Sequence, residues 1–147
     1  MTRLVGPHTP RDPRVRSATR ADEAQIRALQ DHLREPSPAL LEHGLAAGWA
    51  LVSDADGAVA GYVLSVDAPT RSGRHLAELV VAPAHRRAGR GRGLLEAVLE
   101  DTTGAVTLQA HPDNDAALAL YDACGFRVVG RRPDAYADGD ALVLRRE

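Results

Sequence analysis

The segment from Val81 to Gly91, VAPAHRRAGRG, joins one apolar run to the next through glycines and arginines. The first backbone amides of a helix have no partner within the helix, so a glycine-rich helix start attracts an anion. Glycine also lets the backbone approach a phosphate group without a Cβ in the way. Positive charge is concentrated here, in a chain of formal charge −2, by Arg86, Arg87, Arg90 and Arg92. The segment therefore predicts a site for a di- or triphosphate.

Two common nucleotide-binding motifs do not fit this segment. A P-loop needs Gly-Lys-Ser/Thr at the helix start, and the chain contains no lysine. The dinucleotide fingerprint needs the spacing G-x-G-x-x-G, whereas Gly89, Gly91 and Gly93 follow one another at every second position. The structural alternative is a solvated basic turn whose glycines serve tight packing.

Two blocks of sequence resemble the GCN5-related N-acetyltransferases, the GNAT family. The pattern V-x-P-x-x-R-x-x-G-x-G, which begins at Val81, is similar to the acetyl-CoA signature of that family. The block from Leu108 to Phe126 is similar to a later one in which Asn opens a helix, Leu-Tyr lies near its end and Gly-Phe begins the next strand. The segment from Arg131 to Leu144 resembles the RimI branch, which acetylates protein N-termini, although one of the two adjacent tyrosines of that branch is shifted or missing.

The resemblance implies acetyl-CoA as the cofactor. The strand that ends at Val81 would offer backbone hydrogen bonds to the pantetheine arm, which can lie along it like another strand. The loop amides would bind the pyrophosphate, and Asn114 would contact CoA, although capping of its helix explains an asparagine there equally well. The expected cofactor-binding residues are Leu79, Val80, Val81, Arg86, Arg87, Ala88, Gly89, Arg90, Gly91, Arg92 and Asn114.

The same resemblance assigns catalytic roles, with alternatives. Tyr121 matches the general acid of the family, and its alternative is a core aromatic with a satisfied hydroxyl. Gln109 stands where the RimI-like branch often carries Glu or His, and it cannot usefully accept a proton. The candidate bases are His111, two residues further on the same strand face, and Glu78, which interrupts an apolar strand. Their alternatives are a loop-entry residue and a solvent-facing or salt-bridged carboxylate, and His75 is a pocket or strand-edge residue.

The expected reaction is acetyl transfer from acetyl-CoA to a primary amine. An α-amine with a pKa near ~8 is already partly neutral in the cell, while a lysine amine near ~10.4 is mostly protonated. A chain without an obvious base therefore favours a peptide N-terminus as the acceptor. The alternatives are a small-molecule amine, or a non-catalytic acyl-CoA sensor.

These residues need a mixed α/β domain to bring them together. Helices are predicted over residues 20–33, 38–47, 91–100 and 114–123, and strands over 15–18, 49–53, 59–66, 76–81, 106–110, 126–129 and 141–144. The resemblance implies a mostly antiparallel sheet of about seven strands, with splayed middle strands and about four helices. We expect a flexible tail over 1–13, one domain over 14–147, and an acceptor pocket formed by the early helices and a loop from Asp134 to Asp140.

Composition narrows the remaining possibilities. No apolar run approaches the ~20 residues of a membrane span, and the first residues lack the apolar centre of a signal peptide, so we expect a cytoplasmic protein. Cys124 is the only cysteine, and a small core residue is its simplest interpretation. The chain is expected to bind no nucleic acid, membrane or metal, and to be a monomer or a homodimer.

Overall fold

The computed structural model describes residues 11–68 and 73–147. The described part contains a seven-stranded sheet in the order β1-β2-β3-β4-β5-β7-β6, in which only β4 and β5 run parallel. The strands are β1 Val15–Ser17, β2 Ala50–Ala55, β3 Ala58–Asp67, β4 Gly73–Val81, β5 Ala105–Ala110, β6 Arg127–Tyr136 and β7 Gly139–Arg146. The helices are α1 Glu23–Gln30, α2 Pro38–Ala47, α3 Arg90–Glu100 and α4 Asp115–Ala123, with 3₁₀ turns at Arg20–Asp22 and Pro83–His85. The predicted mixed α/β fold is confirmed.

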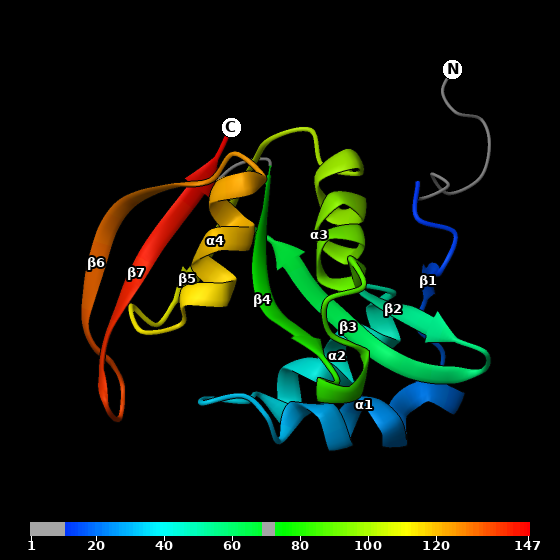
Figure 1. Ribbon diagram of the computed structural model, residues 1–147. Coiled ribbons are helices and arrows are strands. Elements are labelled where there is room, and N and C mark those ends of the chain that lie inside the picture. The colour runs from blue at the N-terminus through cyan, green and yellow to red at the C-terminus, as the bar shows by residue number, and fades with distance from the viewer. Residues whose placement is uncertain (1–10, 69–72) are drawn as a thin grey trace.

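The helices cover the two faces of the sheet in pairs (Figure 1). We call the face covered by α1 and α2 the lower face, and the face covered by α3 and α4 the upper face. Alternation along β3 separates two hydrophobic clusters, because Val63 packs with the upper helices while Tyr62 and Leu64 pack with the lower ones. No helix in the described ranges is long and apolar enough to cross a membrane.

The centre of the sheet is opened by the divergence of β4 and β5. The two strands pair from Gly73 and Ala105 to Leu76 and Leu108, and then part, although they continue to Val81 and Ala110. A bulge lies just beyond this point, because Leu64 of β3 pairs with Glu78 while the next residue pairs with Leu76. The predicted splayed strands are confirmed, and the end of β4 is left with an unpaired edge facing β5.

Several predicted boundaries follow local chemistry. Asp56 and Gly57 both have positive φ angles, 51° and 93°, as a two-residue hairpin turn between β2 and β3 requires. The predicted helix over 20–33 is split into a 3₁₀ turn and α1, and it ends early, at Gln30. The start of this segment is held by a capping box, in which the Thr19 amide donates to the Asp22 side chain at 2.8 Å.

The C-terminal hairpin corrects the sequence prediction. Strands were expected only over 126–129 and 141–144, with a loop from Asp134 to Asp140 between them, but β6 continues to Tyr136 and β7 begins at Gly139. The loop is therefore a two-residue turn. Pattern reasoning missed the extension because residues 130–134 are exposed and read Gly-Arg-Arg-Pro-Asp, with no alternation of apolar and polar side chains.

Candidate active site

The loop between β4 and α3 presents a run of free backbone amides. Arg87 and Gly89 both adopt left-handed conformations, with φ angles of 65° and 77°, and α3 begins at Arg90. None of the amides from Arg87 to Arg92 donates a hydrogen bond to a described residue, and the first one to do so is Gly93, to the Gly89 carbonyl at 3.0 Å. Successive amides in such a turn form a concave site that suits an anion.

Side chains on both sides of the loop hold its shape. Arg86 Nε donates to the Val81 carbonyl at 3.1 Å, and Arg14 Nη1 donates to the Ala88 carbonyl at 3.0 Å. Arg14 in turn pairs with Asp12 at 2.7 Å, and this pair lowers the pKa of the Asp12 carboxyl. Residues 1–10 of the predicted tail lie outside the described ranges, but Asp12 contributes to the support of the loop. Sequence reasoning missed both Asp12 and Arg14.

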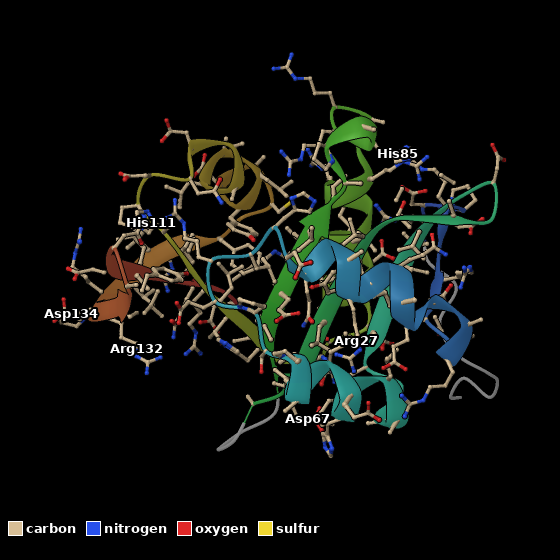
Figure 2. All side chains as sticks on the ribbon, turned by 90° about the horizontal axis from the view of Figure 1, so that it is seen from below. Arg27, Asp67, His85, His111, Arg132 and Asp134 are labelled. Atoms are coloured by element: carbon tan, nitrogen blue, oxygen red, sulfur yellow. The ribbon has the colours of Figure 1, made fainter. Side chains whose placement is uncertain are left out.

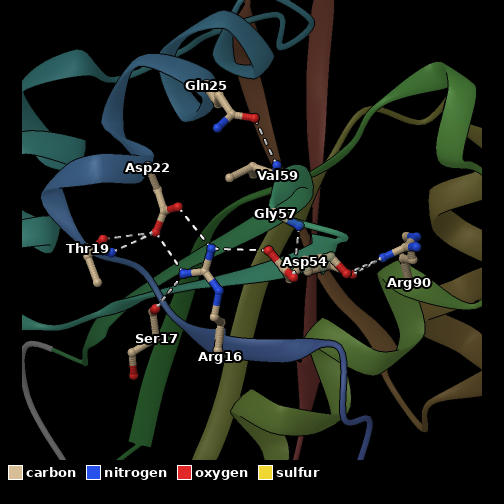
Figure 3. Close-up of polar contacts among 10 residues, drawn as sticks. Arg16, Ser17, Thr19, Asp22, Gln25, Asp54, Gly57, Val59 and Arg90 are labelled. Carbon is tan, nitrogen blue, oxygen red and sulfur yellow. Dashed lines mark hydrogen bonds and ion pairs between the residues drawn. The ribbon is translucent and has the colours of Figure 1, made fainter.

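The arginines of the loop do not all face the same way. Arg90 Nη1 donates to Ser53 Oγ at 2.9 Å and to the Asp54 carbonyl at 3.2 Å, so its side chain is turned toward β2 (Figure 3). Arg92 pairs with Glu96 one turn along α3, at 3.1 Å. Arg90 can therefore contribute its amide to a bound anion while its guanidinium fixes α3 to the sheet.

Gly91 faces the space between β4 and α4. A Cβ at this position would lie 3.5 Å from Leu120 of α4 and 3.6 Å from Val81 of β4. The predicted strand residues Leu79 and Val80 lie on the unpaired end of β4, on opposite faces of the sheet. The loop amides and the free strand edge thus adjoin one another, as binding of an extended phosphate-bearing arm requires.

Glu78 lies on the lower side of the opening and is 4% exposed. Its carboxylate accepts hydrogen bonds from the Tyr62 hydroxyl at 2.8 Å, from the Gln30 amide at 3.0 Å and from the Ser37 backbone amide at 2.9 Å. Burial, with the charge of Glu78 as the next cause, raises the pKa of Tyr62. The alternative of a solvent-facing or salt-bridged Glu78 is wrong, because the group is a buried anchor between β4 and the segment that joins α1 to α2.

His111 lies beyond the end of β5 and is 6% exposed (Figure 2). Its Nδ1 accepts a hydrogen bond from the Asp113 amide at 3.0 Å, which places the proton of the neutral ring on Nε2. Nε2 lies 3.3 Å from Asp138 Oδ1, within ion-pair distance, but out of line for a hydrogen bond. The Tyr136 ring packs against His111 with centroids 5.4 Å apart. Arg34 donates a hydrogen bond to the same Asp138 carboxylate.

Tyr121 lies on α4 and is 7% exposed within the upper cluster. Its ring packs edge-on against Phe126, with centroids 5.8 Å apart. Burial, followed by the influence of Tyr136, raises the pKa of Tyr121 to about 12. The hydroxyl therefore stays protonated at neutral pH, as a proton donor must.

The remaining predicted residues lie around this centre. Asn114 caps α4, since its Oδ1 accepts from the Ala117 amide at 3.2 Å. His75 and Thr107 meet across β4 and β5 at 2.9 Å, and burial lowers the pKa of His75. Cys124 is half-buried beside the upper cluster. Within the described residues, no group of three or more His, Cys, Asp or Glu side chains is placed to hold a metal ion.

The arrangement divides the opening into two sides. One side has the amides from Arg87 to Arg92, the free edge of β4 and the Tyr121 hydroxyl, which suit an extended anionic arm and its leaving group. The lower side has Glu78, and also His111 with its neighbours Tyr136 and Asp138. Sequence reasoning found Glu78 and His111, but it missed their partners Gln30, Tyr62, Asp138 and Arg34. Those residues carry no motif of their own, and only the fold brings them together.

Comparison with known proteins agrees with this geometry. The chain is 44% identical over 70 residues to N-alpha-acetyltransferase RimI of Mycobacterium tuberculosis, which covers 46% of this chain and 44% of RimI. It is 60% identical over 50 residues to mycothiol acetyltransferase of Clavibacter sepedonicus, covering 33% of this chain and 16% of that protein. The chain therefore spans less than half the length of these curated relatives.

A solved structure and a family model match most of the chain. Ard1 from Thermoplasma volcanium superposes with a TM-score of 0.82 at 24% identity, covering 90% of this chain and 95% of Ard1. The model of the acetyltransferase (GNAT) family matches residues 15–126. Because that match takes in most of the chain, including both sides of the opening, the chain belongs to the GNAT family, as predicted.

Proposed function

We propose that this chain transfers an acetyl group from acetyl-CoA to the α-amine of a polypeptide N-terminus. The observation that carries the proposal is the run of amides from Arg87 to Arg92, which donate to no described residue and lie beside the free edge of β4. The match to RimI, named as an N-alpha-acetyltransferase, supports the acceptor class. A cytoplasmic location and a monomeric or homodimeric state are part of the same proposal.

The residues divide the chemistry between them. Acetyl-CoA supplies the thioester whose carbonyl carbon bonds to the amine nitrogen while its bond to sulfur breaks. Leu79, Val80 and Val81 bind the pantetheine arm through their backbone, and the loop from Arg86 to Arg92, with Asn114, binds the rest of the cofactor. Tyr121 holds the proton that the departing sulfur takes up. The nitrogen gives up one proton to solvent water, and Tyr121 regains from water the proton that it gave to sulfur, so no net charge is created.

Neither candidate base is free to take up that proton. In His111, Nδ1 already accepts the Asp113 amide, and Nε2 carries the proton of the neutral ring. The Glu78 carboxylate already accepts hydrogen bonds from the Gln30 side chain, the Ser37 amide and the Tyr62 hydroxyl. We infer that the charge of Glu78 draws the protonated amine toward the opening, and that the acceptor is an amine that loses its proton readily before it attacks. An α-amine fits this requirement.

The acceptor class can be tested with matched peptides. One peptide carries a free N-terminus and no lysine, and its partner carries a blocked N-terminus and one lysine. Near pH 7.5 the neutral fraction of an α-amine exceeds that of lysine on the order of 10²-fold, so kcat/KM should favour the first peptide by a similar factor. Release of free CoA thiol and intact-peptide mass measure it. Preference for the lysine peptide, or for small amines alone, would reject the proposal.

Glu78→Gln separates an electrostatic role from that of a base. We expect kcat/KM for the peptide to fall about 10- to 100-fold, mostly through KM, because a buried charge facing the amine is lost. The pH dependence of kcat/KM should keep the apparent pKa of the peptide α-amine in both proteins. If the wild-type profile instead shows an additional acidic limb that the variant lacks, Glu78 acts as the base. Melting temperature and acetyl-CoA affinity serve as controls for folding.

A further inference from the structure

Helices cover only part of the lower face of the sheet. Helices α1 and α2 pack on β2, β3 and β4. In Figure 2, which is seen from below, no helix lies in front of β6 and β7, and the labelled Arg132 points away from the body of the molecule. On the β5-β7-β6 part of this face, most residues of β6 are exposed and those of β5 and β7 are half-buried, except for the buried Ala141. This part of the face adjoins the opening between β4 and β5.

The strand register places one set of side chains on this part of the lower face. His75 pairs with Thr107, Thr107 with Arg145, and Arg145 with Arg127, which makes one row across four strands. The next row on the same face joins Gln109, Val143 and Gly130, and the third includes Ala141 and Arg132. Together we call the set Thr107, Gln109, Arg127, Gly130, Arg132, Val143 and Arg145 the basic face.

The basic face carries uncompensated positive charge on a chain that is acidic overall. Arg127 and Arg132 are exposed and have no hydrogen bond or ion pair with any residue in the described ranges, while Arg145 pairs with Glu147. A Cβ placed at Gly130 would meet only Val143, at 4.0 Å, so the floor between the two arginines stays open. Arg131, on the opposite face of the same strand, is paired with Asp140. The surface thus combines a small apolar floor with two free cations.

We propose that the basic face binds an acidic segment of the acceptor polypeptide, downstream of the residue that is acetylated. This inference rests on the proposed function. The Thr107 row lies next to Leu108, where β4 and β5 part, and β6 lies two strands away from β5, at about 10 Å. An extended chain covers about 3.4 Å per residue, so about three residues reach from the opening to Arg127. Acidic residues from about the third to the sixth position of the acceptor would then meet Arg127 and Arg132.

A peptide pair tests the proposal. Both peptides share the first two residues, and positions three to six are glutamate in one and glutamine in the other. We expect kcat/KM to be about tenfold higher for the acidic peptide at low salt, and the advantage to shrink as salt is added. In the double variant Arg127→Glu, Arg132→Glu the acidic-to-neutral ratio should fall to one or below. The matched control Arg131→Glu should keep the ratio of the wild type.

Binding gives a second readout that does not need turnover. A fluorescent, N-acetylated form of the acidic peptide should bind the wild type and the Arg131→Glu control, and not the double variant. If no peptide is acetylated, the proposed function fails, while this measurement still decides whether the basic face binds an acidic chain. Equal kcat/KM for both peptides would overturn the inference. The inference would also be overturned if the double variant lost binding of a single-stranded oligonucleotide but kept binding of the acidic peptide. That result would assign the face to nucleic acid.

Discussion

Replacement of Tyr121 by phenylalanine is expected to lower kcat for acetyl transfer by about 10²- to 10³-fold, and to change the Kd for acetyl-CoA by less than about twofold. The substitution removes only a hydroxyl. The ring is 7% exposed and keeps its edge-on contact with Phe126, so the packing of α4 is preserved. The loss should therefore lie in the step at which sulfur departs and takes up a proton.

The shifted pKa of Tyr121 adds a pH test. Burial raises this pKa to about 12, so the proton is held throughout the neutral and moderately alkaline range and is lost only as pH rises through about 12. In the wild type, kcat should show no alkaline decline from this group between pH 7 and about 10.5.

Three measurements separate the outcomes for Tyr121→Phe. Single-turnover rates show whether chemistry or product release limits kcat, calorimetry gives the Kd of acetyl-CoA, and the melting temperature reports folding. An unchanged single-turnover rate would remove Tyr121 from the role of acid. A large rise in Kd, with the rate of the bound complex preserved, would instead make its hydroxyl a cofactor contact.

The loop and the helix starts that we assign to the cofactor could be predicted from sequence because their signals are local. A few adjacent residues determine each of these features: the positive φ at Gly89, the amides at a helix start and the Asn cap. The residues lie between Val81 and Gly93 and at Asn114. The splayed strands came from the family resemblance instead. No residue of β4 or β5 by itself indicates that pairing stops at Leu76.

The surroundings of Glu78 and His111 could not be predicted because their contacts join distant parts of the chain. Glu78 is an anchor only because Gln30, Ser37 and Tyr62 reach it from three other segments. A carboxylate inside an apolar strand indicates a special position, but it does not name its partners. The occupied state of both candidate bases is therefore a finding of the structure, and it is what favours a readily deprotonated acceptor.

The long β6 shows the same limit in another form. Residues 130–134, Gly-Arg-Arg-Pro-Asp, are exposed and have low strand propensity, so their extended conformation comes from pairing with β7. Sequence alone assigned a loop from Asp134 to Asp140. The correction places Arg127 and Arg132 on one ordered surface, on which the inference of an acidic acceptor segment depends.

The second large effect is expected at Gly91, where charge can be separated from bulk. We expect Gly91→Asp to weaken acetyl-CoA binding by at least about 10²-fold, because a carboxylate among the loop amides repels the pyrophosphate and competes for the same donors. Gly91→Ala should bind within about tenfold of the wild type, since its Cβ would make ordinary contacts at 3.5 and 3.6 Å with Leu120 and Val81. Gly91→Asn matches the size of aspartate without the charge and should lie between the two.

Loss of cofactor binding in Gly91→Asp cannot be explained by a less stable fold. Aspartate in the first turn of a helix interacts favourably with the helix dipole, and any of these residues is a better helix former than glycine. The melting temperature of unliganded Gly91→Asp should therefore equal or exceed that of the wild type, while its rise with added acetyl-CoA disappears. If the variant is stable but its melting temperature does not respond to acetyl-CoA, the defect lies in binding by the amides from Arg87 to Arg92. If Gly91→Asp keeps its affinity, the amides from Arg87 to Arg92 do not hold the pyrophosphate, and the assignment of this loop falls.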